Sequence, residues 1–202
     1  DADDDNFFMN YDSDRRLAAL EADGISAEVV FPNTYPPFFP GRSLAGTLPT
    51  TREEFVRRWA GLAAHNRWLV DFCRAVPGRR KGVIQLLPND VDAAVAEVRW
   101  AAEQPEICGA LLASVPPNTI DPLYSAVYDP LWAALVEVGM PVVTHAGGGA
   151  PTLPDDPASM PILIYEYAFW SHRTIWHLIF GGVFERHPEL QFVATEQGGC
   201  KW

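Results

Sequence analysis

Apolar and polar residues alternate along the chain in blocks that predict helices and strands in turn. Five short apolar runs, rich in β-branched residues, are typical of strands buried on both faces. These predicted strands cover residues 27–31, 82–87, 107–115, 141–145 and 190–195. Segments with apolar residues at helical spacing precede the first run and separate each run from the next. The pattern therefore predicts a strict alternation of helix and strand.

The predicted helices carry start and stop signals. The first covers residues 12–23 and stops at Gly24, and a long second helix starts at Thr51, where a T-x-x-E capping box begins. On this second helix His65 lies beside the apolar stripe and is expected to face solvent. The remaining helices are expected to begin after Asn89 or Asp90, at an Asp129 cap followed by Pro130, and within about 161–186.

Strands that are apolar on both faces and alternate with helices predict a parallel sheet covered by helices. An open doubly wound sheet and a (β/α)8 barrel both fit this α/β pattern. Five strands are too few to close an eight-stranded barrel. Either the sheet is open or the barrel is incomplete.

A Pro-rich loop, residues 32–50, follows the first predicted strand. Its five prolines preclude a regular element, and four aromatic residues lie in it or beside it: Phe31, Tyr35, Phe38 and Phe39. Because the loop leaves a strand at its carboxyl end, we expect its aromatic side chains to border a cavity at that edge of the sheet.

The composition and net charge of the chain exclude some classes of binding partner. The 202 residues are 48% hydrophobic and carry a net charge of -11, which predicts a sizeable core and argues against nucleic acid or an anionic membrane as a partner. No apolar run approaches the ~20 residues of a membrane span. The three cysteines form no C-x-x-C pair, and we expect a cytoplasmic protein.

The two ends of the sequence predict a truncated chain. Residues 1–10 resemble an acidic lead-in without a starting Met, and Trp202 falls in what resembles the middle of a sequence. We therefore expect residues 1–202 to form one barrel domain that is cut at both ends.

Two predicted strand ends carry groups that could bind a metal or move a proton. His145 ends one strand and precedes three glycines, 147–149, and Glu196 ends the next. Neighbouring parallel strands lie about 4.8 Å apart, so both side chains could reach one site, and the glycines would leave room there. The alternatives are a core histidine bonded to a backbone carbonyl, and a surface or helix-capping carboxylate.

Other candidates for chemistry are weaker. Trp170, His172 and Arg173 could reach over the same site, although ordinary packing at a helix start explains them as well. The chain has no G-x-G-x-x-G, G-K-[ST], G-x-S-x-G or H-E-x-x-H motif, which argues against dinucleotide, phosphate-loop, serine-hydrolase and zincin sites.

Three segments resemble the amidohydrolase-related family, the branch that includes aminocarboxymuconate-semialdehyde decarboxylase and gamma-resorcylate decarboxylase. They are HAGGG from His145, LIFGGVFERHP over 178–188 and FVATEQGG over 192–199, and the similarity runs from Tyr11 to the end of the chain. The resemblance implies a (β/α)8 barrel, present here from its first helix to its sixth strand, with a divalent metal, often zinc, in its mouth.

The resemblance also assigns roles. It implies that His145 is a metal ligand, with an H-x-H or E-x-H pair expected before residue 1 and an aspartate after residue 202. Many decarboxylases of the family have a catalytic histidine where this chain has Glu196, which departs from the family pattern. From its place at a strand end beside His145, Glu196 is expected to be a general base or acid, or a further ligand. From their places in the chain, and not from the resemblance, the expected substrate-binding residues are Asn33, Trp170, His172 and Arg173, with Arg173 holding a carboxylate.

The predicted function is hydrolysis of a C–O or C–N bond, or decarboxylation of a small carboxylated substrate, with aromatic acids among the candidates. The alternative is a catalytically inactive fragment or degenerate member that binds no metal. For the enzyme, the expected partner is a small-molecule substrate. The sequence leaves open whether the chain forms a homo-oligomer.

Overall fold

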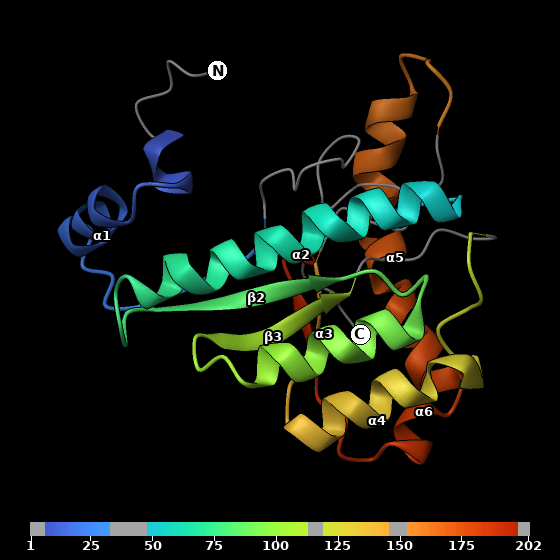
Figure 1. Cartoon of the computed structure of the whole chain (residues 1–202). Helices are drawn as coiled ribbons and strands as arrows, with labels where there is room; N and C mark the ends of the chain where they lie inside the picture. Colours follow the sequence, from blue (N-terminus) through green and yellow to red (C-terminus); the bar gives the residue numbers. More distant parts are fainter. Residues whose placement is uncertain (1–6, 33–47, 113–118, 146–152, 198–202) are drawn as a thin grey trace.

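A computed structural model of the chain (Figure 1) describes residues 7–32, 48–112, 119–145 and 153–197. The helices are η1 (Phe7–Asn10), α1 (Ser13–Ala22), α2 (Arg52–Arg74), α3 (Val91–Ala102), η2 (Ala126–Tyr128), α4 (Asp129–Val138), α5 (Ser159–Phe180) and α6 (Val183–Arg186). The strands are β1 (Glu28–Val30), β2 (Arg80–Leu86), β3 (Ile107–Leu112), β4 (Val142–His145) and β5 (Phe192–Thr195).

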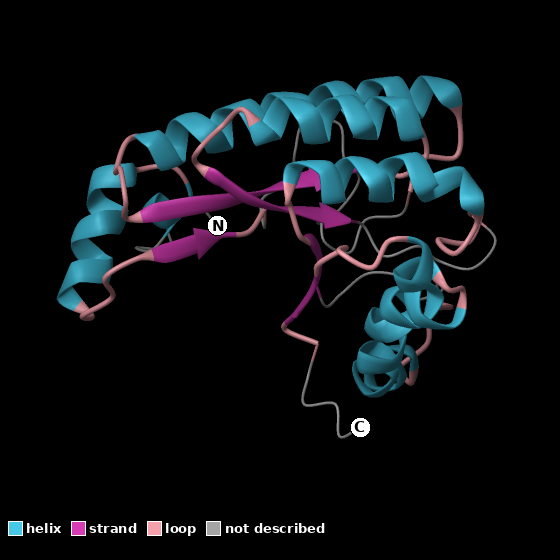
Figure 2. Cartoon of the chain, turned by 90° about the horizontal axis from the view of Figure 1, so that it is seen from below, coloured by secondary structure: helices cyan, strands magenta, loops and turns pink. Residues whose placement is uncertain are grey.

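The five strands form one parallel sheet in the order β1-β2-β3-β4-β5. Helices α2 and α3 run along the sheet on one of its sides (Figure 2), and α3 packs against α4. The strand order never reverses, as it would in a doubly wound sheet, which leaves the geometry of half a barrel. The predicted incomplete (β/α)8 barrel, its parallel strands and their sequential order are therefore confirmed.

The two faces of the sheet bury different clusters, as strand alternation requires. The larger core fills the space between the sheet and the helices and includes Ile84 and Val142. A smaller cluster on the other face joins Val83, Leu111 and Val143. That second face corresponds to the inside of the barrel, where functional side chains at strand ends belong.

The two outer strands of the described sheet are less covered than the central ones. Val29 of β1 is 51% exposed and Val193 of β5 is 42% exposed, whereas Val83 is 2% exposed. In the described sheet β5 pairs only with β4, so β5 is not enclosed as an interior strand would be.

Helix caps confirm part of the sequence analysis. The side chain of Thr51 accepts a hydrogen bond from the backbone N–H of Glu54, which is the start of the capping box. The prediction that Asp129 caps a helix is wrong. Asp129 is already the first residue of α4, and its carboxylate pairs with Arg186. The acidic lead-in is also shorter than expected, since 7–10 form η1.

His65 is buried, at 9% exposure, and does not face solvent as the helical spacing suggested. It lies against the ring of Trp68, with ring centroids 5.3 Å apart, and lines a cavity of about 300 Å³ together with Phe31 and Phe72. Burial lowers the pKa of the imidazole to about 4. The stripe that α2 buries is therefore wider than the apolar residues alone predict.

A buried ion pair ties α1 to the sheet. Glu28 of β1 accepts hydrogen bonds from Arg16 at 2.9 Å and from Arg80 at 2.6 Å, and the Arg80 side chain is 1% exposed. Burial alone would raise the pKa of the Glu28 carboxyl, but the two guanidinium groups outweigh burial and hold this pKa below its usual value.

In the described parts of the chain, no helix has the length and apolar character needed to cross a membrane.

Candidate metal and substrate site

His145 and Glu196 meet at the carboxyl ends of β4 and β5. The Nε2 atom of His145 lies 3.0 Å from Oε2 of Glu196. The His145 side chain is 15% exposed, and the Glu196 side chain is 74% exposed. The site therefore has a histidine held in the fold and a carboxylate that solvent or a ligand can reach. The expected convergence of these two residues is confirmed, while their chemical roles remain predictions.

Strand register explains how His145 reaches this place. His145 is paired with Thr195, and Val143 with Val193 two residues earlier. His145 shares the face of Val143, which belongs to the smaller cluster inside the half-barrel. The ring of Phe31, just after β1, lies 5.6 Å from the imidazole ring between centroids. Phe31 therefore forms an aromatic wall of the site, although it follows β1, the strand at the other edge of the sheet from β5.

Glu196 would face away from His145 if the alternation of β5 simply continued. Phe192 packs into the core on the helix side, so Ala194 and then Glu196 would follow on that side. However, β5 ends at Thr195, and Glu196 has a φ of 51°, the one non-glycine residue with positive φ in the described part of the chain. This left-handed conformation accompanies the turn of the carboxylate toward His145.

Residues on both sides of Glu196 bond to Thr144, the neighbour of His145. The Thr195 hydroxyl donates to the Thr144 carbonyl at 2.8 Å. The Gln197 amide donates from Nε2 to the Thr144 hydroxyl at 2.7 Å, and both side chains are buried. Sequence reasoning did not find Thr144 or Gln197. The available signal was a threonine in an otherwise apolar strand, immediately before the candidate ligand.

The His145–Glu196 pair fits part of a metal site. Two ligand atoms each ~2.1 Å from one ion lie about 3.4 Å apart in a tetrahedral zinc site and about 3.0 Å apart at the right angle of octahedral coordination. The 3.0 Å between Nε2 and Oε2 matches the octahedral value. Catalytic zinc sites take three protein ligands. Within the described residues, no group of three His, Cys, Asp or Glu side chains could hold a metal ion, so His172 does not complete the pair.

The expected substrate-binding residues of the fifth helix lie on α5, which contacts β4. His172 is 6% exposed, and its ring centroid lies 6.2 Å from that of Trp176. Trp170 is half-buried and meets Phe169 edge to face. The pKa of His177 is lowered by burial and then by the positive charge of Arg173, which places this charge near the last turns of α5.

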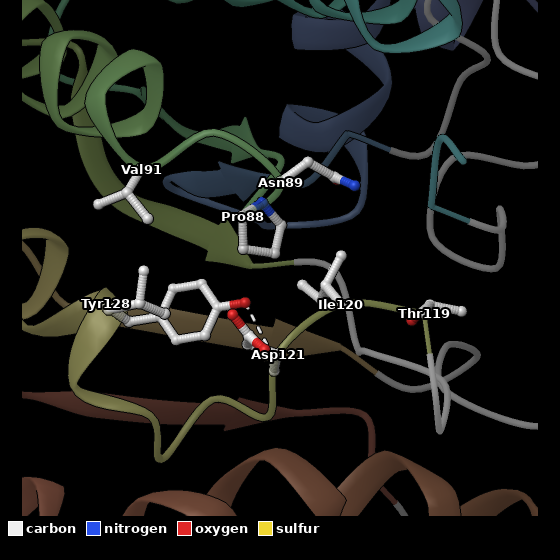
Figure 3. A pocket seen from close by; sticks show the side chains of 8 residues that line it. Pro88, Asn89, Val91, Thr119, Ile120, Asp121 and Tyr128 are labelled. Carbon is white, nitrogen blue, oxygen red and sulfur yellow. Dashed lines mark hydrogen bonds between the residues drawn. The ribbon is translucent and has the colours of Figure 1, made fainter. Parts of the chain in front are cut away.

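A separate cavity of about 440 Å³ lies where the chain leaves β2, beside the segment that leads into α4 (Figure 3). Its polar wall includes Asn89, Asp121 and Tyr128, whose hydroxyl donates to the Asp121 carbonyl at 2.8 Å. Apolar side chains such as Val91 complete the lining, and the described lining residues include no Arg, Lys or His.

Several predicted site residues lie outside the described residues. They include Asn33, the glycines 147–149 and three aromatic residues of the Pro-rich loop, namely Tyr35, Phe38 and Phe39. Their place at the site stays a prediction.

Sequential parallel strands with helices outside define half of an α/β barrel, and the histidine–carboxylate pair lies at the carboxyl edge, where such barrels usually have their site. The family model for amidohydrolases matches residues 9–202, and the chain belongs to this family. The resemblance seen in the sequence is confirmed.

Relatives and solved structures support the same placement. Gamma-resorcylate decarboxylase of Rhodococcus jostii (strain RHA1) is 28% identical over 151 residues, which are 66% of this chain and 44% of the relative. The structure of an amidohydrolase from Mycobacterium avium subsp. paratuberculosis K-10 is similar with a TM-score of 0.68 at 20% identity, over 95% of this chain and 51% of the other.

A further solved structure names its ligands. It is 5-carboxyvanillate decarboxylase from Novosphingobium aromaticivorans DSM 12444, complexed with manganese and 4-hydroxy-3-methoxy-5-nitrobenzoic acid. The TM-score is 0.67 at 24% identity, over 89% of this chain and 48% of the other. The chain thus spans about half the length of the relatives it matches.

Proposed function

We propose that His145 and Glu196 belong to the divalent-metal site of an enzyme that removes carbon dioxide from a small aromatic carboxylate. The observation that carries this proposal is the 3.0 Å approach of Nε2 and Oε2 at the carboxyl ends of neighbouring strands. The decarboxylase relatives support decarboxylation over hydrolysis of a C–O or C–N bond. Because one of them was solved with manganese, Mn²⁺ joins zinc as an ion to test.

In this proposal His145 holds the metal and Glu196 moves a proton. A bound divalent ion supplies Lewis-acid chemistry, by polarising a substrate oxygen or acidifying water. During decarboxylation the bond between the ring carbon and the carboxyl group breaks, its electron pair stays on the ring carbon, and carbon dioxide leaves. The ring carbon then needs one proton, which the exposed carboxyl group of Glu196 can deliver.

The substrate-binding assignments remain part of the proposal. Phe31 supports an aromatic substrate, because its ring lies 5.6 Å from that of His145. Arg173 is proposed to hold a carboxylate, with Trp170, His172 and Asn33 around the substrate. The support for the α5 residues is that this helix contacts β4, the strand that ends in His145.

The test uses the complete gene product with 5-carboxyvanillate and gamma-resorcylate as substrates, and follows carbon dioxide release with added Mn²⁺ or Zn²⁺. His145→Ala should lose metal affinity and activity. Glu196→Gln keeps the size and an oxygen atom but cannot transfer a proton, so metal should remain bound while turnover falls roughly 10²–10⁴-fold. Full activity in Glu196→Gln would refute the proton-transfer role. A protein that binds neither ion would support the alternative of a catalytically inactive family member.

A further inference from the structure

Thr144 connects the two candidate functional residues. It directly precedes His145 in β4 and is fully buried, at 0% exposure. By alternation its side chain lies on the face opposite that of His145, on the helix side with Val142. Thr144 therefore does not belong to the site itself, but it lies against the backbone that carries the site.

Both chain neighbours of Glu196 are bonded to this one residue. Thr195 donates to the Thr144 carbonyl at 2.8 Å, and Gln197 donates to the Thr144 hydroxyl at 2.7 Å. The Gln197 side chain is 6% exposed, so its amide is held on the helix side. With the residues before and after it held in place, Glu196 bridges them with its φ of 51°.

This local conformation opposes the intrinsic preference of glutamate. Left-handed backbone is unfavourable for residues with a Cβ atom and persists only where the surroundings enforce it. The Gln197–Thr144 hydrogen bond is buried and joins two side chains, so it has little competition from water. This hydrogen bond can therefore enforce the turn.

We propose that Thr144 is a positioning residue, which holds Glu196 in the left-handed conformation through Gln197 and so keeps the Glu196 carboxylate against His145. The catalytic consequence rests on the proposed function, whereas the conformational one does not. A valine at 144 keeps the shape and the backbone carbonyl but loses the hydroxyl that accepts from Gln197. Glu196 should then relax toward negative φ, and its carboxylate should leave His145.

The first measurement is metal-free and independent of activity. A residue with positive φ has a short distance between its own amide and α protons, so Glu196 should give a strong NOE between them in the complete gene product. Thr144→Val and Gln197→Leu should each weaken this NOE, and Thr144→Ser should restore it. Tyr128→Phe is the matched control, because it removes a buried hydroxyl bonded to the carbonyl of Asp121 in another part of the fold.

The second measurement is turnover with saturating Mn²⁺. Thr144→Val should lower kcat roughly 10- to 100-fold, as small misplacements of reacting groups do, with Mn²⁺ affinity unchanged. Thr144→Ser and Tyr128→Phe should keep kcat within about twofold of the original protein, well below that misplacement effect. If Thr144→Val does not fold, Gln197→Leu tests the same hydrogen bond from its other end.

The outcomes separate this inference from the proposed function. An unchanged NOE at Glu196 in both Thr144→Val and Gln197→Leu would overturn the positioning role. A weakened NOE together with full activity in Glu196→Gln would support the positioning role and refute the proton-transfer role that the proposed function gives to Glu196. A weakened NOE with a lowered kcat would support both.

Discussion

Protonation of His65 should control the acid stability of this fold. The imidazole is buried in α2 at 9% exposure, and burial lowers its pKa from 6.5 to about 4. In the unfolded chain the pKa returns to about 6.5. Between these two values the unfolded state binds a proton that the folded state does not, so the free energy of unfolding falls as the pH drops. The contribution of neutral His65 is fully present above pH 6.5 and is lost by about pH 4.

The size of this effect follows from the pKa difference. The difference between a pKa of 6.5 and one of about 4 corresponds to about 3–4 kcal/mol at ~1.4 kcal/mol per unit. About 3 kcal/mol of this is lost at pH 4, where the imidazole of the folded chain is half protonated. Such a loss is a large share of the 5–15 kcal/mol that typically stabilises a domain, so the roughly 3 kcal/mol should be measurable.

The assay compares the original protein with His65→Leu. This substitution replaces the titrating imidazole with an apolar side chain that still fills the buried position. Urea unfolding at pH 7 and at pH 4 gives the free energy of unfolding of each protein. The original protein should lose about 3 kcal/mol more than the variant over this range. Carboxylates such as Glu28 titrate in both proteins, so their effect cancels in the comparison. An equal loss in the two proteins would show that His65 does not remain neutral in the folded state.

Three further predictions concern local geometry. Glu196→Gly should be more stable than Glu196→Ala by about 1 kcal/mol in urea unfolding, because glycine tolerates positive φ; equal stability would argue against the left-handed turn. Arg80→Met should lower the unfolding free energy by roughly 3–5 kcal/mol, because it leaves Glu28 buried with one partner fewer, and a loss below about 1 kcal/mol would contradict this reasoning. Gly109→Ala should lower the melting temperature, because a Cβ atom there would lie 2.9 Å from Cγ2 of Val143; an unchanged melting temperature would mean that Val143 can move aside.

Sequence periodicity was sufficient for the elements and their order because these depend on local signals. Apolar runs gave the five strands, and the Thr51 capping box gave the start of α2. Parallel pairing then follows from helical connections between strands, since chain crossovers return each strand in the same direction. Boundaries were less reliable. The cap expected at Asp129 was wrong because η2 leads directly into α4, so that Asp129 is already helical and its carboxylate pairs with Arg186.

The sequence by itself therefore determined a parallel α/β sheet with His145 at a strand end. It also brought Glu196 to the same edge, because neighbouring parallel strands end together. Only the tertiary structure decided the direction of the Glu196 carboxylate, since alternation alone would turn it to the helix side. That direction depends on a left-handed residue beside two hydrogen bonds to Thr144, about fifty positions earlier in the chain. Side-chain periodicity carries no information about such contacts, because they form only when β4 and β5 lie side by side.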